Sequence, residues 1–454
     1  MKHPRSPWSW IPTLYIAEGL PYFAVNTLTV LMYTNLGMSK GQMAFLTGWL
    51  YLPWVIKPFW SPFIDLFKTK RLWVLAMQIV IGIAMGGVAL SLFSSVWIAI
   101  SLVAFWVMAF ASATHDIAAD GLYILALDQR EQAAYVGVRS TFYRVASVVG
   151  QGGLVMLAGW LETRYNDIPK AWTLTFGLLS IFFGLVALYH TYSLPKVASD
   201  HPIPGVSTKT IAADFLDTFV TFFKKPYIIS ALAFMLLYRL PEALCLKLGQ
   251  PFLKDPHSLG GLGLSTTQIG LVNGTVGVLA LLAGGIVGGV VIARGGLKKW
   301  IWPMAAALTL PCVVYCYMAA ALPDNFILIS TLIGIEQFGY GFGFTAFMMF
   351  LMYFSKGESS TSHYAFCTAF MALGMMLPGM WAGWLYEKFD NMDSGSVWDI
   401  VGCLFPGIDN PGSAGYIGFF LCVMLSTLAT FAVTWLVRRN MPDKSITTAV
   451  DNVE

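Results

Sequence analysis

Twelve apolar runs, each long enough to cross a bilayer as a helix, limit the fold of this chain more than any other feature. About twenty apolar residues span the hydrocarbon layer in helical form. Inside that layer every backbone polar group must be bonded within the chain, which only helices and closed barrels achieve. We therefore expect an all-α membrane protein, with no segment left to form a soluble domain. The runs cover residues 11–34, 43–65, 72–93, 96–127, 133–160, 171–194, 226–250, 266–293, 299–321, 325–354, 362–387 and 414–437.

Composition supports the same class of protein. Hydrophobic residues make up 57% of the 454 residues and charged residues 11%, whereas an ordinary soluble domain has about 25% charged residues. The first run follows a basic N-terminus, but it is as long as a full span, contains Glu18 and Pro21, and lacks a convincing small-residue cleavage site. We therefore expect a retained first helix and not a secretory signal.

The distribution of basic residues predicts an orientation. With both termini in the cytoplasm, 18 Lys and Arg residues lie at inner ends and loops, 5 lie on the outer side and 4 lie within spans, which accounts for all 27. An excess of basic residues marks the cytoplasmic side of a membrane protein. The net charge of +3 thus reflects topology, and it gives no reason to expect a nucleic-acid partner.

Polar interruptions divide the chain into two halves. The longest interruption on the inner side separates six spans in residues 1–194 from six spans in residues 226–439. It forms a cytoplasmic linker at 195–225, and the segment at 211–225 has the amphipathic pattern and basic finish of a helix lying on a membrane surface. The short polar tail at 440–454 is expected to be disordered.

The two halves repeat a pattern of broken helices. A Leu-Pro step beside charged residues occurs in the first span at residues 18–21 (EGLP) and in the seventh at residues 239–242 (RLPE). Proline kinks a helix, and interrupted helices at matching positions of two repeats point to a transport site. Each half also has a short basic loop after its second span, as the major facilitator superfamily does. We therefore predict the major facilitator fold, with twelve transmembrane helices in two pseudo-symmetric six-helix halves.

Nine ionisable side chains lie within the predicted spans, away from their ends. Each costs roughly 2.5–3.5 kcal/mol at membrane depth, so nine unpaired groups would cost about 25 kcal/mol. That exceeds the net stability of an ordinary protein, about 5–15 kcal/mol, so pairing or hydration is compulsory. The nine are Glu18, Lys57, Asp116, Asp120, Arg144, Arg239, Glu242, Lys247 and Glu336.

Four of the charged residues are expected to meet in a helix hairpin. Asp116 and Asp120 lie one turn apart on one face of the fourth span. An antiparallel hairpin folded about residue 130 would bring Asp116 level with Arg144 and Asp120 level with Arg139. The result is a charge-paired hairpin inside the hydrocarbon layer.

The seventh span has a charged group of its own. Arg239 and Glu242 are three residues apart, so they are expected to pair on one helix face. Lys247 is then left for another partner. In span ten, Glu336 is the one member of the nine ionisable residues, and it is a candidate for proton coupling.

Glycine patterns in two spans predict no nucleotide site. Span eight has small residues at four-residue spacing, at Ala280, Gly284 and Gly288, which permits close helix packing. The alternate glycines of 339–343 are preceded by no predicted strand and lie at membrane depth, so they do not fit a nucleotide loop.

Two interpretations of the charged groups remain open. In the structural one, they form pairs that lock helices together. In the functional one, acids beside a base exchange protons as a cavity wets and dries, and bases bind an anionic solute. The candidates are Asp116, Glu336, Glu18 and Glu242 for proton coupling; Lys57, Arg144, Arg239, Lys247, His115 and Gln337 for substrate binding; and Asp65, Asp120 and Arg139 as gates or latches.

The sequence predicts no catalytic, metal or cofactor site. Five of the six cysteines fall within spans, and their spacing forms neither a disulfide framework nor a metal quartet. No nucleophile–base set, metal-ligand cluster or phosphate loop is visible, so we do not expect an enzyme. The expected partners are a small-molecule substrate, protons and the lipid bilayer, and the expected state is a monomer.

Several motifs resemble those of a known family. The run at 114–121 (THDIAADG), Tyr143-Arg144, and residues 57–65 (KPFWSPFID) are similar to the AmpG-type muropeptide permeases and the related acetyl-CoA transporters of the major facilitator superfamily. The resemblance implies proton-driven import of anhydro-muropeptides across the inner membrane of a Gram-negative bacterium, for cell-wall recycling.

The sequence departs from these permeases at three places. His115 stands where they have glutamine, Glu18 where they have a small residue, and Pro241-Glu242 where they have glycine and aspartate. His115 adds either a group that titrates near neutral pH or a hydrogen-bonded packing histidine. The alternatives for function are transport of another anionic solute, such as an acyl-CoA or a siderophore, transport of a sugar, and a membrane sensor that does not transport.

Overall fold

The computed structural model describes residues 6–198, 200, 208–357, 359–392, 395–404 and 414–441. Helices make up most of these residues, and no β-strand occurs among them, which confirms the all-α class. Contacts divide the chain into two units. The N unit comprises Met1–Leu36 and Leu50–Leu216, and the C unit comprises Gly37–Trp49 and Asp217–Glu454.

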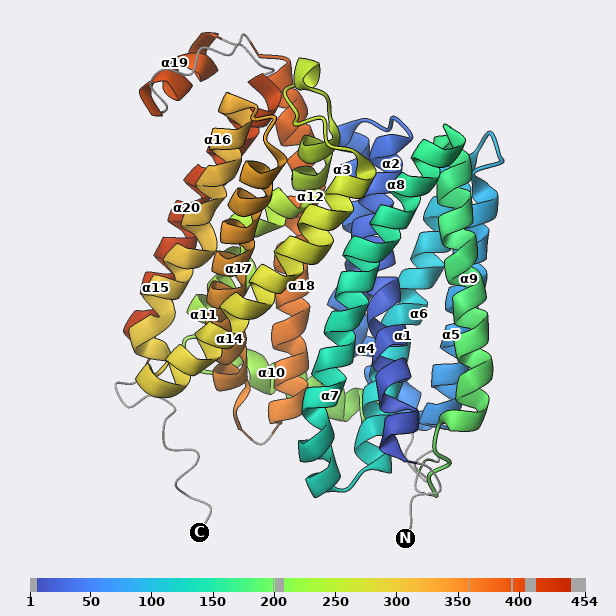
Figure 1. Cartoon of the computed structure of the whole chain (residues 1–454). Coiled ribbons are helices and arrows are strands. Elements are labelled where there is room, and N and C mark those ends of the chain that lie inside the picture. The colour runs from blue at the N-terminus through green and yellow to red at the C-terminus, as the bar shows by residue number, and fades with distance from the viewer. Residues whose placement is uncertain are drawn as a thin grey trace. The chain divides into compact units, whose positions relative to one another are not determined.

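In the N unit, α5, α6 and α9 lie side by side, and α1 packs against α6 and α7 (Figure 1). The linker segment predicted to be amphipathic begins in this unit and is helical, as α10 (Thr208–Phe223). The other main elements are α1 (Ile11–Phe23), η2 (Ala24–Leu28), α2 (Thr29–Asn35), α4 (Leu52–Leu66), α5 (Lys70–Ser91), α6 (Trp97–Ala126), α7 (Gln129–Val148), η3 (Val149–Gly153), α8 (Leu154–Tyr165) and α9 (Ile168–Ser193).

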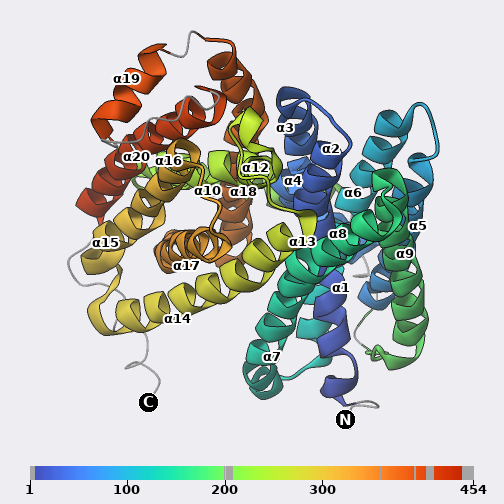
Figure 2. The same ribbon diagram turned by 45° about the horizontal axis from the view of Figure 1, so that its top comes forward.

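In the C unit, α14 packs along α17, which also contacts α15 (Figure 2). The main elements are α3 (Lys40–Trp49), α11 (Ile228–Leu237), α12 (Leu240–Lys254), α13 (Thr266–Ile269), η5 (Gly270–Gly277), α14 (Val278–Gly295), α15 (Leu297–Thr309), α16 (Val313–Ala321), α17 (Phe326–Ser355), α18 (Ser360–Asp390), α19 (Gly395–Leu404) and α20 (Ala414–Asn440).

Among the described residues, ten helical stretches are long and apolar enough to cross a membrane. The other two predicted spans are also helical, but each is interrupted. The first passes into the π-helical turn η2 shortly after Pro21, whose ring clashes with the carbonyl of the preceding turn. The second stops at Trp49 and restarts at Leu52, with Pro53 in the first turn of α4, where a missing backbone N–H is tolerated.

The break in the second span has a consequence for the contact units. Although α3 belongs to the first six predicted spans, it packs against α12 and α18 and groups with the C unit. Glu387 of α18 accepts a hydrogen bond from the backbone N–H of Gly41 at 2.7 Å. Gly383 lies so close to the backbone of Lys40 that any side chain there would collide with it. The absence of a side chain thus lets α3 and α18 meet backbone to backbone.

The glycines of spans eight and ten pack helices against each other. A Cβ added to Gly284 would collide with the backbone of α17, and one added to Gly288 would collide with the side chain of Thr345 on α17. One added to Gly341 would collide with the carbonyl of Leu281 on α14. Gly343 contacts α15 in the same way. The close packing predicted for span eight is therefore confirmed, and the alternate glycines of span ten lie at two helix interfaces.

Candidate functional site

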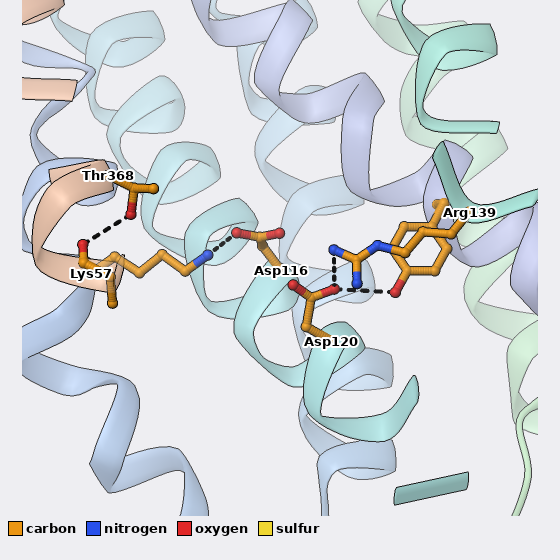
Figure 3. A network of polar contacts seen from close by, with 7 residues as sticks. Lys57, Asp116, Asp120, Arg139 and Thr368 are labelled. Atoms are coloured by element: carbon orange, nitrogen blue, oxygen red, sulfur yellow. Dashed lines mark hydrogen bonds and ion pairs between the residues drawn. The ribbon is translucent and has the colours of Figure 1, made fainter. Parts of the chain in front are cut away.

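The N unit contains a cluster of charged side chains, which we call the carboxylate cluster: Glu18, Lys57, Asp116, Asp120 and Arg139. Helix α6 places Asp116 and Asp120 one turn apart, and the cluster draws on α4 and α7 for its bases (Figure 3). Lys57 forms an ion pair with Asp116, and Arg139 forms one with Asp120 at 2.8 Å. The five side chains thus come from four helices.

A tyrosine completes the contacts of Asp120. The hydroxyl of Tyr15 donates a hydrogen bond to Asp120 Oδ1 at 3.1 Å. The guanidinium of Arg139 lies 4.7 Å from the centre of the Tyr15 ring, within range of a cation–π interaction. Asp120 is therefore held by α1 and α7 together.

Glu18 is the acid of the cluster that lacks a full set of partners. Its side chain is buried, with 7% exposure, and its Oε2 has no hydrogen-bond partner among the described residues. Carboxylate oxygens of Glu18, Asp116 and Asp120 lie within 4.8 Å of one another. With every group ionised, three acids and two bases give the cluster a net charge of −1. The same oxygens lie close enough together to share one cation.

The hairpin prediction is half right. The contact between Asp120 and Arg139 is confirmed, but Asp116 pairs with Lys57 and not with Arg144, which is exposed. The register of a hairpin does not specify how each helix is rotated about its own axis. At 3.6 residues per turn, five residues separate Arg139 and Arg144 by about 140° around α7, so both cannot face α6.

His115 lies buried among the helices of the N unit. Its side chain is fully buried, and its Nε2 lies 3.0 Å from Nε2 of Gln78 on α5. Gln78 also contacts Nδ1 of His190, whose Nε2 lies 2.9 Å from the hydroxyl of Thr13. These contacts join α1, α5, α6 and α9 and support the packing interpretation of His115. Gln78 and His190 carried no sequence signal, because neither belongs to a motif.

In the C unit, the predicted pair of Arg239 and Glu242 is confirmed. It is bidentate, with Nε to Oε2 and Nη2 to Oε1 both at 2.7 Å. Arg239 Nη2 also donates to the hydroxyl of Tyr340 at 3.0 Å, and the guanidinium lies 4.7 Å from the ring of Phe344. The chain is interrupted here, because α11 ends at Leu237 and α12 starts with a Leu-Pro step.

Two further candidates of the C unit are deeply buried. The ammonium of Lys247, 2% exposed, donates to the hydroxyl of Thr47 on α3 at 3.1 Å. Glu336 on α17 accepts a hydrogen bond from the side chain of its neighbour Gln337 at 2.8 Å. The side chain of Asp65 lies outside what the structure describes, so its role as a latch stays a prediction.

Sequence reasoning missed a second charged network, which joins α3, α12 and α20. Lys40 forms an ion pair with Asp255 at 2.6 Å, and Asp255 accepts a hydrogen bond from the hydroxyl of Tyr416 at 2.8 Å. The ammonium of Lys40 also lies 5.0 Å from the centre of the Tyr386 ring. These residues flank predicted spans, where a charged residue is ordinary and gives no signal.

Long apolar helices with broken segments and buried charged groups define a multi-pass membrane protein of the transporter class. The sequence model of the Major Facilitator Superfamily matches residues 13–244. The chain belongs to the Major Facilitator Superfamily, as the sequence pattern predicts.

The relatives bear out the resemblance found in the motifs. The anhydromuropeptide permease of Escherichia coli K12 is 26% identical over 383 residues, which cover 82% of this chain and 73% of that protein. A protein of Rickettsia conorii that carries the name AmpG 4 is 25% identical over 334 residues, covering 71% of this chain and 76% of that protein.

Solved structures share the fold. A bacterial homologue of the human lysosomal transporter Spinster aligns with a TM-score of 0.70 at 15% identity, covering 95% of this chain and 96% of its own. A D-xylose–proton symporter aligns with a TM-score of 0.65 at 13% identity, covering 97% and 99%. The predicted major facilitator fold is thus confirmed.

Proposed function

We propose that this protein is a proton-coupled importer of peptidoglycan fragments, anhydro-muropeptides, in the cytoplasmic membrane of a Gram-negative bacterium. Its termini lie in the cytoplasm and it works as a monomer. Relatives that cover most of the chain carry the names of muropeptide permeases and AmpG transporters, which supports the cargo. The carboxylate cluster is the observation that supports the coupling.

The coupling argument rests on charge balance. A buried carboxylate without a compensating charge costs several kcal/mol, and the fully ionised cluster has one such charge in excess. A proton on Glu18, Asp116 or Asp120 removes that excess while the site is closed to water. Glu18 is the first choice, because Asp116 and Asp120 each have a basic partner and Glu18 Oε2 has none among the described residues. Hydration of the open site then favours release of the proton.

The C unit supplies groups suited to an anionic glycopeptide. Arg239 already holds a carboxylate in a bidentate grip, the geometry in which a guanidinium binds a carboxylate best. A carboxylate of the cargo exchanges with Glu242 in this grip, while Tyr340 and Phe344 offer ring surfaces beside it. An uncharged solute has no carboxylate that could replace Glu242 in the grip of Arg239.

Uptake by proteoliposomes tests the proposal. Labelled GlcNAc-anhydroMurNAc-tripeptide should accumulate under an inward proton gradient, and an uncoupler should abolish the accumulation. Asp116→Asn should abolish uphill uptake in a folded protein. Asp324→Asn is the matched control, since the side chain of Asp324 is 94% exposed and its ion pair among the described residues is with His257, at 3.8 Å.

Each failure identifies a different error. Full accumulation by Asp116→Asn would refute the assignment of the carboxylate cluster. Accumulation that is unchanged by the uncoupler would refute proton coupling. If the folded protein takes up no label, the cargo is instead another anionic solute or a sugar. Binding without movement of label into the vesicle would favour a sensor.

A further inference from the structure

A large apolar groove lies within the N unit, between α4, α5 and α6. Its volume is about 650 Å³, inside the range of roughly 300–1,000 Å³ usual for sites that bind small molecules. Its walls include Trp60 of α4, Phe67 of the turn after α4, Trp73 of α5, and Val103 and Val107 of α6. None of the carboxylate cluster lines it, so it is separate from the transport site proposed above.

The lining offers few partners to a polar ligand. Of its twelve lining residues none carries a charge, and the polar side-chain groups are the hydroxyl of Thr114 and the indole N–H groups of Trp60, Trp73 and Trp106. A sugar or peptide placed there would leave its hydrogen-bonding groups unpaired, at a cost of several kcal/mol. The groove is also accessible from outside, because Val103 is 64% exposed and Val107 is 44% exposed. In a bilayer the surrounding medium is hydrocarbon, so the natural occupant is an acyl chain.

A basic turn lies between two of the residues that line the groove, Phe67 and Trp73. The chain passes from α4 to α5 through residues 67–69, and α5 begins at Lys70. Two lining residues meet across this turn, where the indole N–H of Trp73 donates to the carbonyl of Phe67 at 2.6 Å. Lys68, in the turn, is exposed. Arg71 follows at the start of α5, where its Nη2 donates to the carbonyl of Thr191.

Among the residues whose side chains the structure describes, no acid forms an ion pair with Lys68. Asp200 accepts hydrogen bonds from the backbone N–H groups of Lys70 and Arg71, at 2.7 and 3.1 Å, and thus caps α5. Lys70 itself is buried, with its alkyl chain against α6 at Gly121. Positions 65–71 carry three bases and one acid, Asp65. This turn therefore retains positive charge at an exposed ammonium.

We propose that this groove is a binding site for an anionic phospholipid, with one acyl chain between α4, α5 and α6 and the phosphate at Lys68, assisted by Arg71. Lipid tails are as apolar as the helix surface, so the acyl chain contributes packing but little preference for one lipid over another. Preference comes from the headgroup, since a base near the membrane surface attracts an anionic lipid by about 1 kcal/mol, or about fivefold in affinity.

Native mass spectrometry of the full-length protein tests this site. The protein is titrated with phosphatidylglycerol and with phosphatidylcholine of the same acyl chains. Lys68→Gln should lower the preference for phosphatidylglycerol about fivefold, whereas Lys299→Gln, an exposed base of the C unit, should not. Val107→Trp fills the groove and should reduce retention of both lipids. Leu185→Trp, on the exposed face of α9, is its control.

The outcomes separate the two parts of the proposal. An unchanged preference in Lys68→Gln would refute the headgroup site. Retention unchanged by Val107→Trp would refute the groove as the place of the chain, even if Lys68→Gln behaves as expected. Equal loss in the variants and their controls would mean that lipid binds the basic or apolar surface without a site. Circular dichroism and gel filtration of each variant establish that it is folded.

Discussion

Replacing Lys57 by Met tests the pairing at the centre of the carboxylate cluster. The substitution keeps most of the side-chain volume but changes the net charge of the cluster from −1 to −2, and it leaves Asp116 without its base. Removing one partner of a fully buried pair costs about 3–5 kcal/mol, and an exposed pair is worth about 0–1 kcal/mol. Because Lys57 and Asp116 are 28% and 24% exposed, we expect a loss of about 2 kcal/mol in the free energy of unfolding.

The second substitution should repair the first. Asp116→Asn in the Lys57→Met background removes the orphaned carboxylate and returns the cluster to −1. The double variant should therefore recover most of the stability, with a coupling energy of about 1–3 kcal/mol for residues in contact. Reversible unfolding in mixed detergent micelles, followed by tryptophan fluorescence, gives the four free energies of the cycle.

The control cycle uses Arg144, the partner that hairpin register alone predicted. Arg144→Met and Asp116→Asn should be additive within about 0.5 kcal/mol, as for independent sites, because Arg144 is exposed and Asp116 pairs with Lys57. Coupling in the Arg144 cycle without coupling in the Lys57 cycle would refute both the pairing and the rotation argument.

Three other substitutions test separate parts of the structure. Gln78→Leu should cost about 1–3 kcal/mol in unfolding free energy, because it leaves His115 and His190 buried without their shared partner. Gln78→Met, which keeps the length of the side chain but lacks the amide, distinguishes lost bonds from lost volume. Gly341→Ala should cost about 1–3 kcal/mol, the usual cost of overpacking, since its Cβ would collide with the backbone of α14; a thermal shift below 1 °C would contradict this. Asp255→Asn removes the ion pair with Lys40 of α3 and weakens the hydrogen bond from Tyr416 of α20. Since α3 is then held less tightly, a cysteine placed at position 42 of α3 should be alkylated faster.

Local spacing predicted the contacts that lie within one helix or one hairpin. Arg239 and Glu242 pair because three residues of helix bring them to one face. Asp120 and Arg139 meet because a short turn fixes the register of α6 against α7. The spans could also be predicted from single apolar runs, because the thickness of the bilayer sets a similar length for each of them.

Contacts between helices distant in the chain could not be predicted in this way. Lys57 and Asp116 lie on α4 and α6, and no periodicity in either run specifies how these two helices are rotated about their axes. The chain of Gln78, His115 and His190 joins three helices in the same manner. The attachment of α3 to the C unit depends on the absence of a side chain at Gly383, which looks like any other glycine in a span.

The distribution of buried charge favours different tasks for the two units. In the C unit, Arg239 and Glu242 form an ion pair whose charges cancel, whereas Lys247 donates to Thr47 and Glu336 accepts from Gln337. The carboxylate cluster of the N unit sums to −1. The neutral pair of Arg239 and Glu242 can exchange its internal carboxylate for that of a solute, whereas the carboxylate cluster needs one more positive charge to be neutral. Neutralising Glu242 should therefore change the apparent affinity for the solute, and neutralising Glu18 should change the dependence of uptake on the proton gradient.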